Sequence, residues 1–220
     1  VTLTNDGLIV FDVTTQPPTL VPGARYVTSG NARDVQVAGT TAFVADGTNG
    51  IVFLDLFDIH TPINLITVNP PGNVSGLEVV EDRLYAAAGT GGLRVYDITT
   101  LNGPELLGTW NTANPAYRLR VVGNYAYVTC DGGRLEIINI QNPSAPSLAA
   151  TYLASGQFTD VDVVGGYALL ANTNGNVLLL DISDPADPMD VSTNLVAAGA
   201  WAGRLVGANA YVRTGAGNLV

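Results

Sequence analysis

Charged side chains that recur at one fixed spacing are the residues of this chain best suited to do chemistry. With the uncharged Gln36 at their head, they form a column of five positions that are 42 residues apart, namely Gln36, Glu78, Arg120, Asp162 and Arg204. Four consecutive members alternate in sign, which favours ion pairs between neighbouring structural units, because charges near a core persist when they are paired. The same groups would also suit a polar ligand, since charged residues with altered ionisation gather at binding sites. The sequence leaves both interpretations open.

A second set of residues lies beside that column and could form a binding face. Its members are Arg33, Asp34, Tyr117, Arg118, Phe158, Asp160 and Trp201. Exposed aromatic rings there could stack on sugars or anchor a protein partner, while packing between structural units is the alternative. A glycosidase would need two carboxyl groups about 5–9.5 Å apart, drawn from Asp34, Glu78, Asp160 and Asp162. No catalytic motif surrounds these residues, so we expect a protein that is not an enzyme.

Residues for metal or nucleophilic chemistry are scarce. His60 is the only histidine and Cys130 the only cysteine, which leaves almost no material for a zinc cluster or a histidine-based triad. Turns such as 46–49 and 172–175 carry oxygens, but they lack the acidic spacing of a calcium loop. We expect no cofactor and no metal, and we expect Cys130 to be a small buried apolar residue.

Composition restricts the partners. The net charge is −10, with nine arginines and no lysine, so the surface would repel phosphate backbones and nucleic acid is not expected as a partner. No apolar stretch is long enough to span a membrane. Hydrophobic residues make up 47% and charged residues 13% of the chain, which predicts a sizeable folded core. Because the first residue is Val1 and it falls within an expected strand, we expect the chain to be part of a longer protein.

An apolar segment that recurs along the whole chain must position these residues. Its copies begin at Leu8, Ile51, Leu93, Leu135 and Val177, with a sixth starting at Leu219. The segment ends in a polar column formed by Asp12, Asp55, Asp97, Asn139 and Asp181. A side-chain oxygen at that position is expected to accept a hydrogen bond from a backbone N–H a few residues on and so to start a turn.

Each repeat reads as four short strands, for example about 117–122, 125–129, 134–140 and 147–153. The third strand is almost continuously apolar, which indicates a sheet covered on both faces. A four-stranded unit of about 42 residues is typical of a β-propeller blade. We therefore predict an all-β fold, a β-propeller of four-stranded antiparallel blades with five repeats. The repeats form either a closed five-bladed ring or part of a six- to eight-bladed one.

The expected organisation is a single propeller domain over residues 1–220. Its repeat units are predicted at about 1–28 (partial), 29–69, 70–110, 111–153, 154–194 and 195–220 (partial).

The recurring segments LIVFDV, IVFLDL and VLLLDI, together with DISDPADP and YAYVTCDGG, resemble the LVIVD repeat of bacterial and archaeal surface and secreted proteins. The loops DLFDIHTP and DITTLNGP depart from its usual pattern. The resemblance implies a propeller-like fold and an extracellular or cell-surface location, with the periplasm also compatible. It implies no enzyme activity.

These observations lead us to expect a non-catalytic interaction or scaffolding module that binds a protein or a polysaccharide. The binding face would be formed by the loops from fourth to first strands and from second to third strands, because variable loops on a rigid frame usually carry binding. Two alternatives remain: a carbohydrate-binding or carbohydrate-active propeller, and a structural subunit of a larger assembly. Unpaired sheet edges would then be completed by the rest of the chain or by a neighbouring subunit.

Overall fold

The computed structural model describes residues 2–3, 7–12, 14, 19–195 and 199–214. The predicted sixth copy of the apolar segment, at Leu219, lies outside these residues, as does part of the predicted loop at 197–203. The chain divides into two compact units, Val1–Leu107 and Gly108–Val220. All regular elements within the described residues are β-strands.

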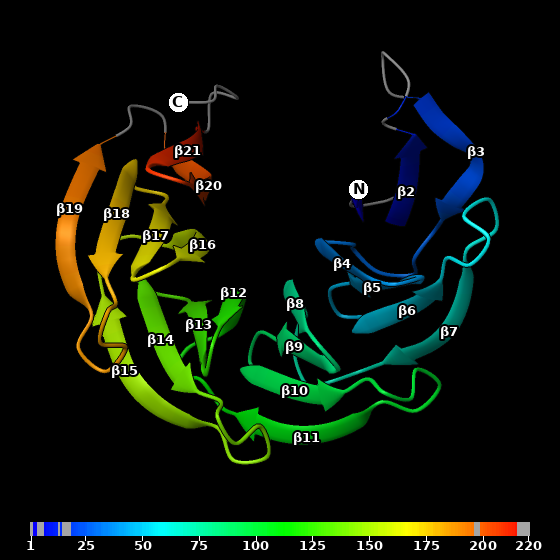
Figure 1. Cartoon of the computed structure of the whole chain (residues 1–220), viewed down its shortest axis with the longest axis horizontal. Helices are drawn as coiled ribbons and strands as arrows, with labels where there is room; N and C mark the ends of the chain where they lie inside the picture. Colours follow the sequence, from blue (N-terminus) through cyan, green and yellow to red (C-terminus); the bar gives the residue numbers. More distant parts are fainter. Residues whose placement is uncertain (1, 4–6, 13, 15–18, 196–198, 215–220) are drawn as a thin grey trace. The chain divides into compact units, whose positions relative to one another are not determined.

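Unit 1 contains three antiparallel sheets (Figure 1). The first has the order β1-β2-β3 and consists of β1 (Thr2–Leu3), β2 (Gly7–Asp12) and β3 (Thr19–Tyr26). The second has the order β4-β5-β6-β7, with strands Asp34–Ala38, Thr41–Ala45, Ile51–Asp55 and Ile63–Val68. The third joins β8 (Gly76–Val80), β9 (Arg83–Ala87), β10 (Leu93–Asp97) and β11 (Glu105–Trp110), whose last residues belong to unit 2.

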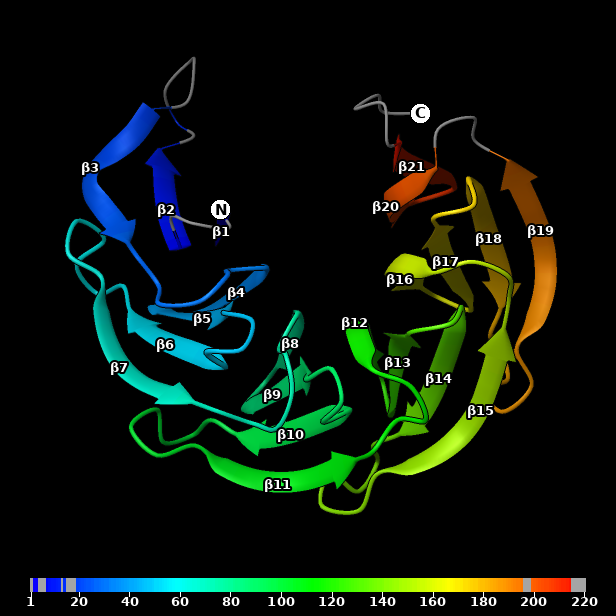
Figure 2. The same cartoon turned by 180° about the vertical axis from the view of Figure 1, so that it is seen from behind.

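Unit 2 repeats the same construction (Figure 2). One four-stranded sheet joins β12 (Ala116–Val122), β13 (Tyr125–Cys130), β14 (Arg134–Asn139) and β15 (Ser147–Leu153). The next joins β16 (Phe158–Val164), β17 (Tyr167–Asn172), β18 (Asn176–Asp181) and β19 (Met189–Leu195). A two-stranded sheet follows, formed by β20 (Ala200–Val206) and β21 (Asn209–Thr214). These bounds agree closely with the strands predicted from the sequence, and each sheet pairs its strands in chain order as a blade does.

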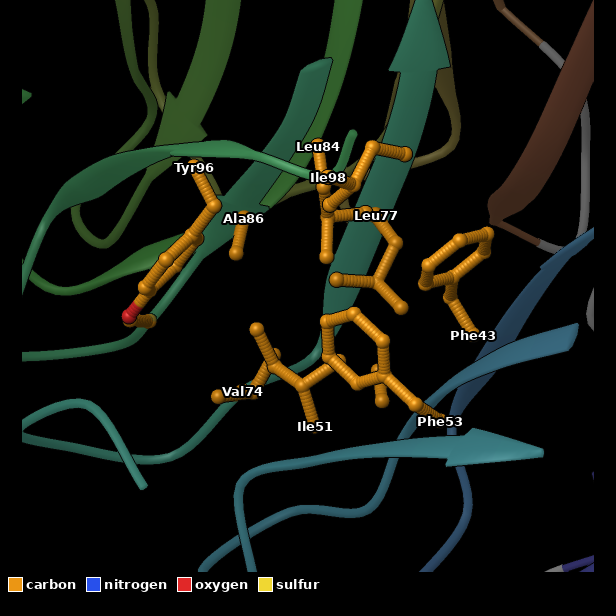
Figure 3. Packing of buried hydrophobic residues seen from close by; sticks show 11 residues of the cluster. Phe43, Ile51, Phe53, Val74, Leu77, Leu84, Ala86, Tyr96 and Ile98 are labelled. Atoms are coloured by element: carbon orange, nitrogen blue, oxygen red, sulfur yellow. The ribbon is translucent and has the colours of Figure 1, made fainter. Parts of the chain in front are cut away.

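The third strands form the core, as their apolar sequences predicted. Ile51, Val52, Phe53 and Leu54 of β6 are all at most 1% exposed, so both faces of that sheet are covered. Figure 3 shows the packing on one of these faces, where Phe43, Ile51 and Phe53 lie in one cluster with Leu77 and Tyr96 of the next sheet. The Phe43 and Phe53 rings meet edge to face with their centroids 4.9 Å apart. Burying each large apolar side chain stabilises the fold by about 1.5–3 kcal/mol.

The polar residue that ends each third strand forms the turn that the sequence predicted. In five repeats its side-chain oxygen accepts the backbone N–H two residues on: Asp12 from Thr14, Asp55 from Phe57, Asp97 from Thr99, Asn139 from Gln141 and Asp181 from Ser183. The resulting turns reverse the chain at the same point of every repeat, and this keeps the 42-residue register that positions the candidate site.

Candidate functional site

A β-bulge lies near the start of each first strand in unit 2. The pairing register shifts between Ala116 and Arg118, between Phe158 and Asp160, and between Ala200 and Ala202. The extra residues are Tyr117, Thr159 and Trp201. A bulge adds one unpaired residue and aims its side chain away from the regular strand directions. Each of these repeats therefore presents one variable side chain at the same point of the fold.

These three bulge residues belong to strands that contact one another, because β12 packs beside β16 and β16 beside β20. Trp201 is 53% exposed, whereas Tyr117 and Thr159 are half-buried. The Tyr117 hydroxyl donates to Asp131 Oδ2 at 3.3 Å, and the Thr159 hydroxyl donates to the carbonyl of Ala200 at 2.9 Å. Trp201 is therefore the exposed aromatic residue of this row.

In unit 1 the matching positions are Arg33, which is exposed, and Ser75, which is buried. Their backbone N–H groups donate to the carbonyls of Ala45 and Ala87, at 2.8 and 3.0 Å. The loops beside them are bridged, since Gly47 and Val74 exchange two backbone hydrogen bonds of 3.1 and 3.0 Å. This end of unit 1 is held together by backbone contacts between successive repeats.

The charged column of unit 2 contains an ion pair between repeats. Arg120 Nη2 lies 2.9 Å from Asp162 Oδ1, and Asp162 is only 2% exposed. The other carboxylate oxygen, Asp162 Oδ2, accepts the backbone N–H of Leu205 at 2.7 Å. One buried carboxylate thus joins three successive first strands, β12, β16 and β20.

Arg204 belongs to the same column, but its partner is Asp160, which lies two residues before Asp162 on β16. Arg204 Nη1 lies 2.9 Å from Asp160 Oδ2, which also accepts the backbone N–H of Gly203 at 3.2 Å. In unit 1 the equivalent Asp34 Oδ2 accepts the backbone N–H of Leu77 at 2.9 Å. Asp34, Asp160 and Asp162 each hold the backbone of the following repeat, so their chemistry is that of structural connectors.

The remaining polar and charged candidates are half-buried on first strands. Gln36 lies on β4 and Glu78 on β8 in unit 1, and Arg118 lies on β12 in unit 2. The backbone N–H of Arg118 donates to Thr129 Oγ1 at 3.1 Å.

Phe158, the third aromatic candidate, is 1% exposed. Its ring stacks on Tyr152 with the centroids 6.5 Å apart, and it belongs to the apolar cluster between the two complete sheets of unit 2. Phe158 is therefore a core residue and offers no surface to a ligand.

Glu136 is a structural residue that the sequence reasoning missed. It lies within the apolar strand β14, is 2% exposed, and accepts the Trp110 indole N–H at 2.8 Å and the backbone N–H of Ala113 at 2.9 Å. It thereby fixes the loop that leads into β12. The signal was an acidic residue inside the segment LEIINI, where two of the equivalent residues are Val52 and Leu178.

Cys130 and His60 occupy very different environments. Cys130 is fully buried, and burial raises the pKa of its thiol to about 12. His60 is exposed in a loop after β6, with Nδ1 3.2 Å from Asp58 Oδ1. Among the residues that the structure describes, no three His, Cys, Asp or Glu side chains come together in a way that could hold a metal ion. In the same part of the chain, no helix is long and apolar enough to cross a membrane.

Solved structures identify the class of fold. The chain matches the β-propeller domain of Cps50 (Swd1) from Myceliophteria thermophila with a TM-score of 0.75 and 11% identity, covering 89% of this chain and 70% of that one. It matches BamB from Moraxella catarrhalis with a TM-score of 0.69 and 15% identity over 89% and 58% of the two chains. It also matches the computationally designed Ika8 protein with a TM-score of 0.73 and 12% identity over 91% and 60%.

The protein thus has the fold of a β-propeller, and it spans about 60% of the length of two of these similar chains. No curated protein matches it in sequence. The LVIVD-repeat family model matches residues 29–64, 71–112, 115–154 and 155–194. The chain therefore belongs to the LVIVD-repeat family, as its recurring segments indicated.

Proposed function

We propose that this protein is a non-catalytic interaction module of a secreted or cell-surface protein, and that it binds a protein partner through the end that carries the bulge residues. The row of bulge residues supports this proposal most directly. The same bulge recurs in three repeats of unit 2, while its side chain changes from one repeat to the next. In the last of them Trp201 is 53% exposed. Large, rigid aromatic residues of this kind often anchor protein interfaces.

The engaged carboxylates support a binding role over a catalytic one. Asp160 and Asp162 are buried, paired with arginine and bonded to backbone N–H groups. A general acid or base needs an oxygen that can reach substrate, whereas these contacts occupy both oxygens of Asp162 and Oδ2 of Asp160.

A photo-crosslinking experiment in the cells that produce the protein tests which end is used. A photoreactive phenylalanine would replace Trp201 in one variant and Phe57, which is 86% exposed in the loop after β6, in the matched control. We expect a discrete crosslinked protein from position 201 and none from position 57. Crosslinks from position 57 alone, or from neither position, would contradict the proposal.

A carbohydrate-binding module is the second candidate, because an exposed tryptophan can also stack on a sugar ring. A glycan array with the native protein and the Trp201→Ala variant tests it, with Tyr167→Ala as the control for an exposed aromatic residue elsewhere (Tyr167 is 46% exposed). Glycan binding that is lost with Trp201→Ala alone would favour this second function over the first.

A further inference from the structure

The hairpin β20–β21 in unit 2 exposes residues that are buried in every complete sheet. Tyr211 of β21 is 45% exposed, whereas the side chains at the same position of the other repeats, Phe43, Tyr85, Tyr127 and Leu169, are at most 3% exposed. In those sheets a third strand lies beside the second, as in the pairing of Tyr127 with Ile137. No third strand pairs with β21 among the residues that the structure describes.

An apolar cavity of about 310 Å³ lies between this hairpin and the sheet β16–β19. Its wall on the sheet side includes Leu169, Val177 and Leu179, and its wall on the hairpin side includes Leu205 and Ala210. Small residues in the hairpin leave the space open. Gly207, Ala208 and Ala210 are the small hairpin residues that line it.

The preceding pair of sheets shows what fills this space when a third strand is present. The residues there that correspond to Leu169, Val177 and Leu179 are Tyr127, Leu135 and Ile137. They pack in one cluster with three apolar residues at and just after the next third strand, namely Leu178, Leu180 and Ile182. These three residues alternate along the chain, so they project from one face of β18. The cavity therefore has the walls of an inter-blade core that lacks three alternating apolar side chains.

We propose that this cavity and the edge of β21 that faces away from β20 bind the third and fourth strands of a further LVIVD repeat. Backbone hydrogen bonds to β21 would extend the sheet, and alternate apolar side chains of the added strand would enter the cavity, which is the usual chemistry of strand addition. The similar solved chains support this occupant, because 30–42% of their length lies beyond the part that this chain covers.

A synthetic peptide that corresponds to Asn176–Leu195, the third and fourth strands of the last complete sheet, is a suitable probe. We expect the labelled peptide to bind the whole chain with a saturable rise in fluorescence anisotropy. We also expect it to slow hydrogen exchange at the β21 amides. A peptide with Leu178→Asp and Leu180→Asp should bind at least about tenfold more weakly, because it would bury charge in an apolar site.

A peptide with Val177→Asp and Leu179→Asp is the matched control, because those side chains would face away from the cavity and binding should persist. On the protein, Ala210→Asp should reduce binding by about tenfold or more. Ala186→Asp adds the same charge at an exposed loop position and should leave binding unchanged. Equal binding of the two doubly charged peptides, failure of the native peptide to bind, or protection of β21 by a second copy of the chain alone would each overturn the proposal.

Discussion

At the scale of single residues, three acidic side chains connect successive repeats. Asp34, Asp160 and Asp162 each accept a backbone N–H from a residue 43 positions later, at distances between 2.7 and 3.2 Å. The sequence predicted ion pairs along the column, and Arg120 with Asp162 is one of them. It did not predict that the backbone would be a partner, because an amide N–H carries no residue-specific signal.

Replacing Asp162 with alanine should therefore destabilise the protein. The change leaves the Arg120 guanidinium and the Leu205 N–H without this acceptor, and a buried polar group that loses its partner costs about 1–3 kcal/mol. Urea denaturation should show that loss in the free energy of unfolding. Asp187→Ala, at an exposed loop position, removes the same charge and should change stability by less than about 0.5 kcal/mol. Equal losses in the two variants would show that Asp162 is not a connector.

Cys130 should be chemically inert in the folded protein. Burial raises the pKa of its thiol to about 12. The thiolate is the reactive form, and very little of it exists at pH 8. A thiol reagent such as DTNB should react slowly with the native protein and rapidly once urea has unfolded it. A native reaction rate equal to the unfolded one would mean that the thiol is accessible.

At the scale of the strands and loops, the sequence predicted what repeats and missed what varies. The third strands and the polar turn column were confirmed, because burial and turn geometry impose the same residue types on every copy. The bulges could not be predicted, since their residues Tyr117, Thr159 and Trp201 share no chemical property. The pairing register of the backbone decides where these side chains point, and residue types do not indicate a register shift.

The turns after the third strands should make stability depend on pH in the acid range. Hydrogen bonds from Thr99 and Ser183 lower the pKa of Asp97 and of Asp181. A group whose folded pKa lies below its unfolded value, about 3.9 for aspartate, stabilises the fold above that value. The stabilisation is lost as the pH falls through the folded pKa.

Replacing both aspartates with asparagine should flatten this dependence below about pH 4, while leaving the fold intact at pH 7. Asn139 already forms the same turn with a 2.9 Å hydrogen bond from Gln141, so the amide can replace the carboxylate. Thermal melts at pH 7 and pH 3 measure the effect. A double variant with the same loss of Tm on acidification as the native protein would show that these turns do not contribute.

At the scale of the whole molecule, stability should be distributed over the contacts between successive sheets. A repeat protein buries most of its apolar surface between neighbouring units, so its stability is roughly a sum of repeat and neighbour contributions. In unit 1 the cluster of Phe43, Ile51, Phe53, Leu77 and Tyr96 is one such contact.

Phe53 provides the sharpest test of this view, because it is fully buried in β6 and contacts Phe43 edge to face. Phe53→Ala should cost about 3–5 kcal/mol, which combines lost burial with the cavity that remains. Because Phe53 joins two sheets, hydrogen exchange should accelerate in β8–β10 as well as in β4–β7. Phe57→Ala, at an 86% exposed position four residues away, should leave both exchange and stability nearly unchanged. Faster exchange confined to β6 would contradict a core shared between neighbouring sheets, and would mean that each sheet of unit 1 is stabilised within itself.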